Sequence, residues 1–133
     1  MNKTTKKRTK AYISFDFDWT LYNPETDSII KETKDIMDKY IKSGYNICIT
    51  TLRAENDIKR IKELFPEITT YPTGGFNKTV ALKKYIPVPI LKHYDDDLNT
   101  CISLKRWTRI VPVWVRNKKM LEEMNDIEHI DLP

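Results

Sequence analysis

The sequence has no long apolar run and only two cysteines. No stretch approaches the roughly 20 apolar residues that a membrane-spanning helix needs. The first positions are polar and basic, so they lack the apolar centre of a signal peptide. Cys48 and Cys101 lie too far apart to indicate a disulfide framework or a cysteine metal site. We therefore expect a cytoplasmic protein that does not bind membranes and whose thiols are inert.

Internal repeats and low-complexity linkers are also absent from the sequence. Its 133 residues, 40% hydrophobic and 32% charged, are typical of one domain. The net charge is +4, and much of it lies in the first ten residues, whose basic side chains are Lys3, Lys6, Lys7, Arg8 and Lys10. We expect a basic arm over residues 1–10 and a single domain over residues 11–133. The arm either attracts polyanions by releasing their counterions or is a solvated tail.

From residue 11 onward, short β-rich apolar runs alternate with amphipathic helical segments. This alternation predicts an α/β fold, a three-layer Rossmann-like sandwich with a parallel sheet of about five strands. The predicted strands span residues 12–17, 45–50, 68–71, 90–94 and 110–115. The predicted helices span residues 29–42, 55–65, 77 to just before Pro87, 98–106 and, at the C-terminus, 117–124.

Two carboxylates follow the first predicted strand, at the edge of the sheet where α/β ligand sites form. Asp16 and Asp18 are two positions apart, so both side chains can reach one cation if the chain is still extended at Asp18. If the chain has already turned at Asp18, its side chain does not converge with that of Asp16 on one cation, and its backbone carbonyl or side chain has another role. Oxygen ligands without a neighbouring histidine or thiol favour magnesium over zinc. The alternative is that both aspartates cap the following turn.

Other polar residues follow the second and fourth predicted strands. Thr51 and Arg53 end the second strand, and Asp95 and Asp96 end the fourth. Because the carboxyl ends of parallel strands share one edge, these side chains should gather beside Asp16. In the alternative interpretation, the threonine merely ends a strand and the arginine is solvated.

The order of these groups, DxDxT, then T-x-R, then a lysine, then paired aspartates, resembles the haloacid dehalogenase superfamily. The resemblance covers residues 13–97. It implies a nucleophile at Asp16, which forms an aspartyl-phosphate, and a general acid/base at Asp18. It also implies that the Thr51 hydroxyl holds a phosphoryl oxygen and that Lys78, after the helix cap Asn77, offsets the negative charge.

The metal expected from the same resemblance is Mg²⁺. Its expected ligands are Asp16, Asp18, Asp95 and Asp96, although Asp97 leaves the register of the acidic cluster open. The expected substrate contacts come from Trp19, Thr20 and Arg53, and the planar fork of the arginine suits a phosphate.

Several positions leave alternatives open or depart from the family pattern. Thr50 competes with Thr51, and Lys83 and Lys84 are rivals of Lys78. Thr79 stands where relatives often have proline after the lysine. Trp19 stands where many relatives have a small or acidic residue, so it shapes the entrance, stacks on a substrate or packs.

No stretch of the sequence is long enough for the cap domain that many members of this superfamily carry. The segment over residues 22–28 is too short for a cap, and residues 68–76 must supply a strand and a turn. The resemblance therefore implies a capless, open phosphomonoester hydrolase suited to a macromolecular substrate such as a polynucleotide end. The aromatics Trp19, Tyr22 and Phe76, expected to be exposed, agree with nucleic acid as a partner. A nucleotidase or small-molecule phosphatase is one alternative, and a non-catalytic magnesium-binding regulatory or nucleic-acid-binding module is another.

Overall fold

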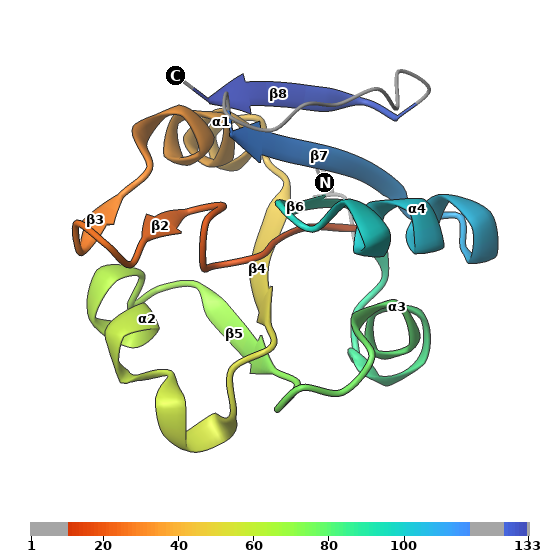
Figure 1. The fold of residues 1–133 in the computed structure, drawn as a ribbon, viewed down its shortest axis with the longest axis horizontal. Coiled ribbons are helices and arrows are strands. Elements are labelled where there is room, and N and C mark those ends of the chain that lie inside the picture. The colour runs from red at the N-terminus through yellow and green to blue at the C-terminus, as the bar shows by residue number, and fades with distance from the viewer. Residues whose placement is uncertain (1–10, 118–126, 133) are drawn as a thin grey trace, which may run out of the picture.

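The computed structural model describes residues 11–117 and 127–132, and its centre is a six-stranded parallel sheet (Figure 1). The spatial order of the strands is β5-β4-β1-β6-β7-β8. Their bounds are Tyr12–Phe15 (β1), Asn46–Thr51 (β4), Thr69–Pro72 (β5), Ile90–Asp95 (β6), Val111–Asn117 (β7) and His129–Leu132 (β8). Counted along the chain, this is the order 3-2-1-4-5-6 of the doubly wound Rossmann fold. The predicted α/β class is confirmed, with one strand more than expected.

Helices cover both faces of the sheet, which makes the three layers visible in Figure 1. On one face lie α1 (Lys31–Lys42) and α2 (Lys59–Leu64). On the other lie α3 (Lys78–Val80), which continues as a π-helical turn over Ala81–Tyr85, and α4 (Leu98–Trp107). The side chain of Asn77 caps α3 by accepting a hydrogen bond from Val80 N, as predicted.

The strand β1 lies in the middle of the sheet, and most of its side chains are buried in the core. Ile13 and Phe15 point to one face of the sheet and Ser14 to the other, and all three are almost completely buried because helices cover both faces. The ring of Phe15 stacks on that of Tyr94 in β6 with 4.6 Å between centroids. This packing fixes β1 against β6, and the candidate site lies at the ends of those two strands.

The ends of several elements differ from the sequence prediction. The first strand stops at Phe15 rather than at residue 17, and residues 29–30 precede α1 because Ile29 pairs in a hairpin of β2 (Tyr22–Asn23) and β3 (Ser28–Ile29). The predicted second helix is divided into a 3-10 turn over Glu55–Asp57 and α2. The predicted C-terminal helix is wrong at Asn117, which ends β7, and its remaining residues 118–124 lie outside the described residues.

No further domain is inserted among the described residues. Only the β2–β3 hairpin lies between β1 and α1, and only residues 73–77 lie between β5 and α3. The expected absence of a cap therefore agrees with the structure. The basic arm over residues 1–10 lies outside the described residues. In the part of the chain that the structure describes, no helix has the length and apolar character needed to cross a bilayer.

Candidate active site

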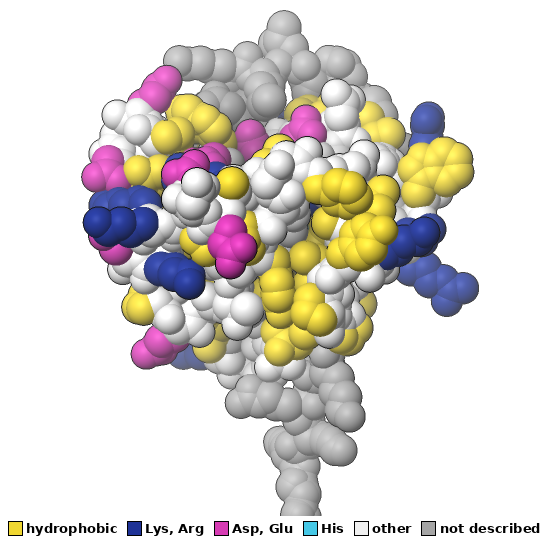
Figure 2. Space-filling model, turned by 90° about the horizontal axis from the view of Figure 1, so that it is seen from below, with side chains coloured by type: hydrophobic (Ala, Val, Ile, Leu, Met, Phe, Trp, Pro, Cys, Tyr) yellow, Lys and Arg dark blue, Asp and Glu magenta, His cyan; other side chains and the backbone are white. Residues whose placement is uncertain are grey.

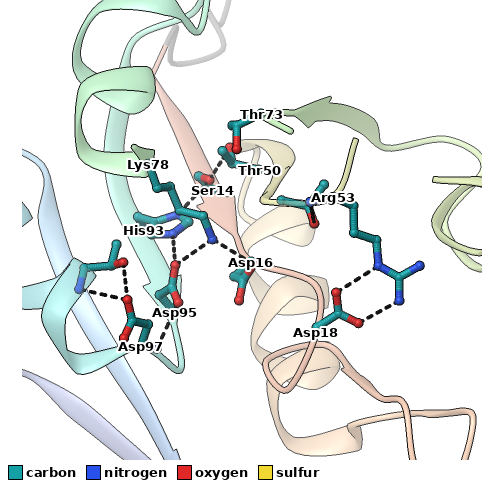
Figure 3. A network of polar contacts seen from close by, with 12 residues as sticks. Ser14, Asp16, Asp18, Thr50, Arg53, Thr73, Lys78, His93, Asp95 and Asp97 are labelled. Atoms are coloured by element: carbon teal, nitrogen blue, oxygen red, sulfur yellow. Dashed lines mark hydrogen bonds and ion pairs between the residues drawn. The ribbon is translucent and has the colours of Figure 1, made fainter. Parts of the chain in front are cut away.

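The candidate site lies at the carboxyl edge of the sheet, where β1 and β6 end side by side (Figure 3). The crossover helices after these two strands cover opposite faces, which makes this edge the switch point of the fold. Asp16 follows the last residue of β1, and Asp95 is the last residue of β6. Both carboxylates are buried.

Lys78 reaches into the site from the first turn of α3. Its Nζ donates hydrogen bonds to Asp16 Oδ1 at 2.8 Å and to Asp95 Oδ2 at 2.9 Å, and the residue is only 5% exposed. Burial by itself lowers the pKa of Lys78, but the attraction of the two carboxylates outweighs burial and raises it. The ammonium therefore stays charged. Lys83 and Lys84 are exposed further along the same helix, so the structure brings Lys78 alone of the three to these carboxylates.

Three carboxylates converge beside this lysine. Asp16, Asp95 and Asp96 each offer one oxygen atom, and these oxygens lie within 4.8 Å of one another. Burial, followed by repulsion from Asp95, raises the pKa of Asp16, and burial raises the pKa of Asp96 to about 6. For Asp95, burial acts in the same direction, but Lys78 and His93 outweigh it and lower the pKa.

The donor set fits a divalent cation of the hard class. When all three carboxylates are ionised, the one ammonium leaves two negative charges that a cation would compensate, and the three ligand atoms are all oxygens. Oxygen-only sites suit Mg²⁺, Ca²⁺ or Mn²⁺ rather than zinc. Asp97 has a different task, because its Oδ2 caps α4 by accepting hydrogen bonds from the N–H and the hydroxyl of Thr100.

Asp18 lies away from the three carboxylates in this arrangement. The chain turns after Phe15, and Trp19 adopts a left-handed conformation with φ of 64°. The Asp18 carboxylate forms a two-pronged ion pair with Arg53, with 2.9 Å from Nε to Oδ2 and 2.8 Å from Nη2 to Oδ1 (Figure 3). The structure therefore does not bring the Asp18 side chain into the group that could hold a metal, because β1 has ended and the chain bends at Phe17 before it reaches Asp18.

The remaining predicted residues lie around this pair. Thr51 is buried at the end of β4, and its hydroxyl accepts a hydrogen bond from the backbone N–H of Arg53 at 3.2 Å. Thr20 is completely buried, and its hydroxyl has no hydrogen-bond partner among the described residues. Trp19 is 36% exposed at the turn. The expected exposure of Tyr22 is wrong, because its ring stacks on Phe17 inside the core.

A buried polar chain behind Asp95 escaped the sequence analysis. His93 Nε2 lies 2.7 Å from Asp95 Oδ2, His93 Nδ1 lies 2.8 Å from Ser14 Oγ, and Ser14 Oγ lies 2.9 Å from Thr50 Oγ1. Burial lowers the pKa of His93, which keeps the ring neutral. Because an ionised Asp95 can only accept, Nε2 carries the proton and Nδ1 accepts from Ser14.

This chain of donors holds Asp95 in one orientation. A signal for it exists in the sequence, since His93 and Asp95 are two positions apart on one strand and therefore point to the same side. The Thr50 hydroxyl belongs to this series of hydrogen bonds behind Asp95, whereas the Thr51 hydroxyl binds the backbone N–H of Arg53.

Comparisons with protein-family models and with curated proteins find no significant match to this chain. The resemblance to the haloacid dehalogenase superfamily therefore rests on the residues of the chain themselves.

Proposed function

We propose that this protein is a magnesium-dependent phosphomonoester hydrolase that works through an aspartyl-phosphate on Asp16. The observation that carries the proposal is the buried Asp16 carboxylate, held by Lys78 beside Asp95 and Asp96 at the switch point of the sheet. Asp16, Asp95 and Asp96 would hold the Mg²⁺, which when bound neutralises charge on the phosphate. A contribution from Asp18 to the metal would come through its backbone carbonyl, since its side chain is engaged elsewhere.

The residues can divide a displacement at phosphorus into two steps. In the first step, an oxygen of Asp16 attacks phosphorus and the bond to the ester oxygen breaks. Asp18, which takes up a proton from solvent once Arg53 has moved to the phosphate, gives that proton to the departing oxygen. In the second step, water attacks the same phosphorus, Asp18 takes its proton, and the bond to Asp16 breaks to release inorganic phosphate. Lys78 holds one Asp16 oxygen throughout and offsets the charge that accumulates on the phosphoryl group.

Arg53 has a place in this proposal as a phosphate-binding residue. Its guanidinium matches a phosphate as well as it matches the Asp18 carboxylate, because both offer two oxygens to the planar fork. The pair is partly open to solvent, with the Arg53 side chain 21% and the Asp18 side chain 33% exposed. If Arg53 exchanges its ion pair with Asp18 for one with the substrate phosphate, the Asp18 carboxylate becomes available for proton transfer.

The test is phosphate release from a panel of an aryl phosphate, mononucleotides, phosphopeptides and 3′- or 5′-phosphorylated oligonucleotides, with Mg²⁺ or with a chelator. Asp16→Asn should abolish release because it removes the nucleophile. Asp18→Asn should slow release by about 10²- to 10⁴-fold and leave phosphate bound to the protein, detectable with radiolabelled substrate. Asp35→Asn, which changes an exposed acid on α1, is the matched control.

Each outcome bears on a different interpretation. Release that requires Mg²⁺ and Asp16 supports the hydrolase, and the preferred substrate distinguishes a polynucleotide end from a nucleotide or another small molecule. Full activity of Asp16→Asn contradicts the mechanism. If the wild-type protein binds Mg²⁺ by calorimetry but releases phosphate from no substrate, the non-catalytic module is the better interpretation.

A further inference from the structure

In the part of the chain that the structure describes, the two faces of the sheet differ in charge. Residues 68–94 and 98–117, which contain α3, its π-helical turn and α4, include no aspartate or glutamate. Figure 2 shows the result: Lys and Arg side chains stand beside hydrophobic ones at the right, over α3 and α4, whereas acidic side chains mix with basic ones at the left. The exposed cations of the α3–α4 side are Lys83, Lys84, Lys105, Arg106 and Arg109.

These cations have no acidic partner among the described residues. On the opposite face Lys31, Lys34 and Arg60 each form an ion pair with a nearby aspartate. No such pair involves the exposed cations over α3 and α4 in the part of the chain that the structure describes. Unpaired cations gathered on one side provide a field that attracts an external polyanion.

Two adjoining cavities lie on this side. The first has a volume of about 360 Å³ and begins at Asn77, the residue before Lys78. The second has a volume of about 520 Å³ and reaches Arg109. Lys83 and Trp107 line both cavities, so the two adjoin each other, and we call them together the α3–α4 groove. One end of the groove is therefore next to the residue that holds Asp16.

Large aromatic rings are exposed in and beside the groove. Trp107 is 66% exposed, Tyr85 is 64% exposed, and Phe76 is 48% exposed. Phe76 and Tyr85 contact each other edge to face with 5.6 Å between ring centroids. Exposed rings among unpaired cations are the combination with which proteins hold single strands, because bases stack on the rings while cations contact phosphates.

We propose that the α3–α4 groove binds a single strand of nucleic acid and leads its phosphorylated end to Asp16, an inference that rests on the proposed function. Trp107 is the stacking platform, and Lys83 and Lys84 contact the strand's phosphates. An acidic peptide would satisfy the cations but would leave the exposed indole of Trp107 without a stacking partner. The ten residues of α4 extend about 15 Å, which corresponds to about four nucleotides at the stacked rise of 3.4 Å.

The experiment measures binding separately from turnover. The Asp16→Asn protein with Mg²⁺ is titrated into fluorescein-labelled tetranucleotides that carry a 3′- or a 5′-phosphate, and fluorescence anisotropy gives Kd. Trp107→Ala should raise Kd about tenfold, whereas Trp107→Phe, which keeps an aromatic face, should restore most of the affinity. Lys83→Gln with Lys84→Gln should raise Kd and reduce the slope of log Kd against log salt by about 1.4.

The matched control is Lys39→Gln with Lys42→Gln, which removes the same charge from exposed lysines of α1 on the opposite face. An equal loss of affinity in this control would overturn the proposal, because net charge alone would then explain binding. Unchanged binding by Trp107→Ala, together with equal competition by polyglutamate, would overturn it in favour of an acidic protein partner.

Turnover of the otherwise wild-type variants distinguishes this proposal from the proposed function. The groove variants should raise KM for the oligonucleotide and leave kcat/KM for an aryl phosphate unchanged. If the wild-type protein hydrolyses no phosphate but the Asp16→Asn protein still binds the strand through Trp107, the phosphatase is wrong and the groove is supported. If aryl phosphate is hydrolysed and the groove variants bind and turn over oligonucleotides normally, the groove is wrong and the phosphatase stands.

Discussion

At the scale of single residues, the central feature is a lysine buried among acids. Lys78 Nζ contacts Asp16 and Asp95 in a place almost closed to solvent. Moving an isolated charge out of water costs several kcal/mol, and only close pairing with hydrogen bonds offsets that cost. The contacts that would hold Asp16 for the proposed chemistry therefore also keep this part of the fold stable.

Replacing Lys78 with methionine should lower the free energy of unfolding by about 3 kcal/mol, because it leaves buried carboxylates without their cation. Added Mg²⁺ should recover more stability in Lys78→Met than in the wild-type protein, since the uncompensated negative charge is larger. Urea denaturation with Mg²⁺ and with chelator measures both effects. Lys84→Met changes an exposed lysine of the same helical segment and is the control. An unchanged urea midpoint for Lys78→Met would contradict the buried ion pair.

At the scale of elements, Asp27 ties the β2–β3 hairpin to α2. Tyr22 Oη donates to Asp27 Oδ1 at 2.6 Å, and Arg60 of α2 donates to both Asp27 oxygens at 2.9 and 3.2 Å. The hairpin follows the loop that carries Asp18, and the segment before α2 carries Arg53. This tie between two elements therefore supports the relative position of the Asp18–Arg53 pair.

The tie should depend on pH. Hydrogen bonds from Tyr22 and then Arg60 lower the pKa of Asp27, so its stabilising effect is present above the pKa of about 3.9 in the unfolded chain. The effect is lost as pH falls through the lower pKa of the folded state. Asp27→Asn should therefore lower Tm at pH 7, and the difference from wild type should shrink in acid. Thermal melts from pH 7 to pH 2 test this, with Glu25→Gln in the same turn as control. A Tm difference between Asp27→Asn and wild type that does not change with pH would show that the charge of Asp27 does not stabilise the contact between the hairpin and α2.

At the scale of the whole molecule, the charged side chains of the described residues are divided unequally between two sides of one core. The α1–α2 side mixes acids with bases, while the α3–α4 side has exposed cations and the candidate groove. The three aspartates at the end of β6 are the only acids between residue 68 and residue 117. In the proposed function, a polyanion that approaches along the α3–α4 side would meet these cations before the acidic centre, where bound Mg²⁺ would offset the negative charge.

Deleting residues 1–10 should weaken binding to long polyanions and reduce its salt dependence, because the arm supplies five basic side chains. Hydrolysis of a small aryl phosphate should stay unchanged, since every proposed catalytic residue lies in residues 11–117. Filter binding to a long single strand at several salt concentrations, alongside aryl phosphate turnover, tests this expectation. Equal loss in both assays would show that the arm contributes to the fold instead.

Local patterns were sufficient to predict most of the fold. The alternation of apolar strands and amphipathic helices predicts the parallel sheet, and the cap at Asn77 predicts the start of α3. The strand β8 was missed because His129–Leu132 is short and its burial comes from pairing with β7, which no local pattern records. The end of β1 was placed two residues late because Phe17 is apolar, although its ring packs beyond the strand.

The sequence by itself determined which strand ends carry the candidate site residues, because the carboxyl ends of parallel strands share one edge and the acids, Thr51 and Arg53 lie at or just after those ends. Only the tertiary structure decided how these groups pair. Asp18 faces Arg53, 35 positions away, and His93 contacts Ser14, 79 positions away. Such contacts arise from the packing of distant segments and from the turn at Trp19. Neither periodicity nor residue type along the chain encodes them.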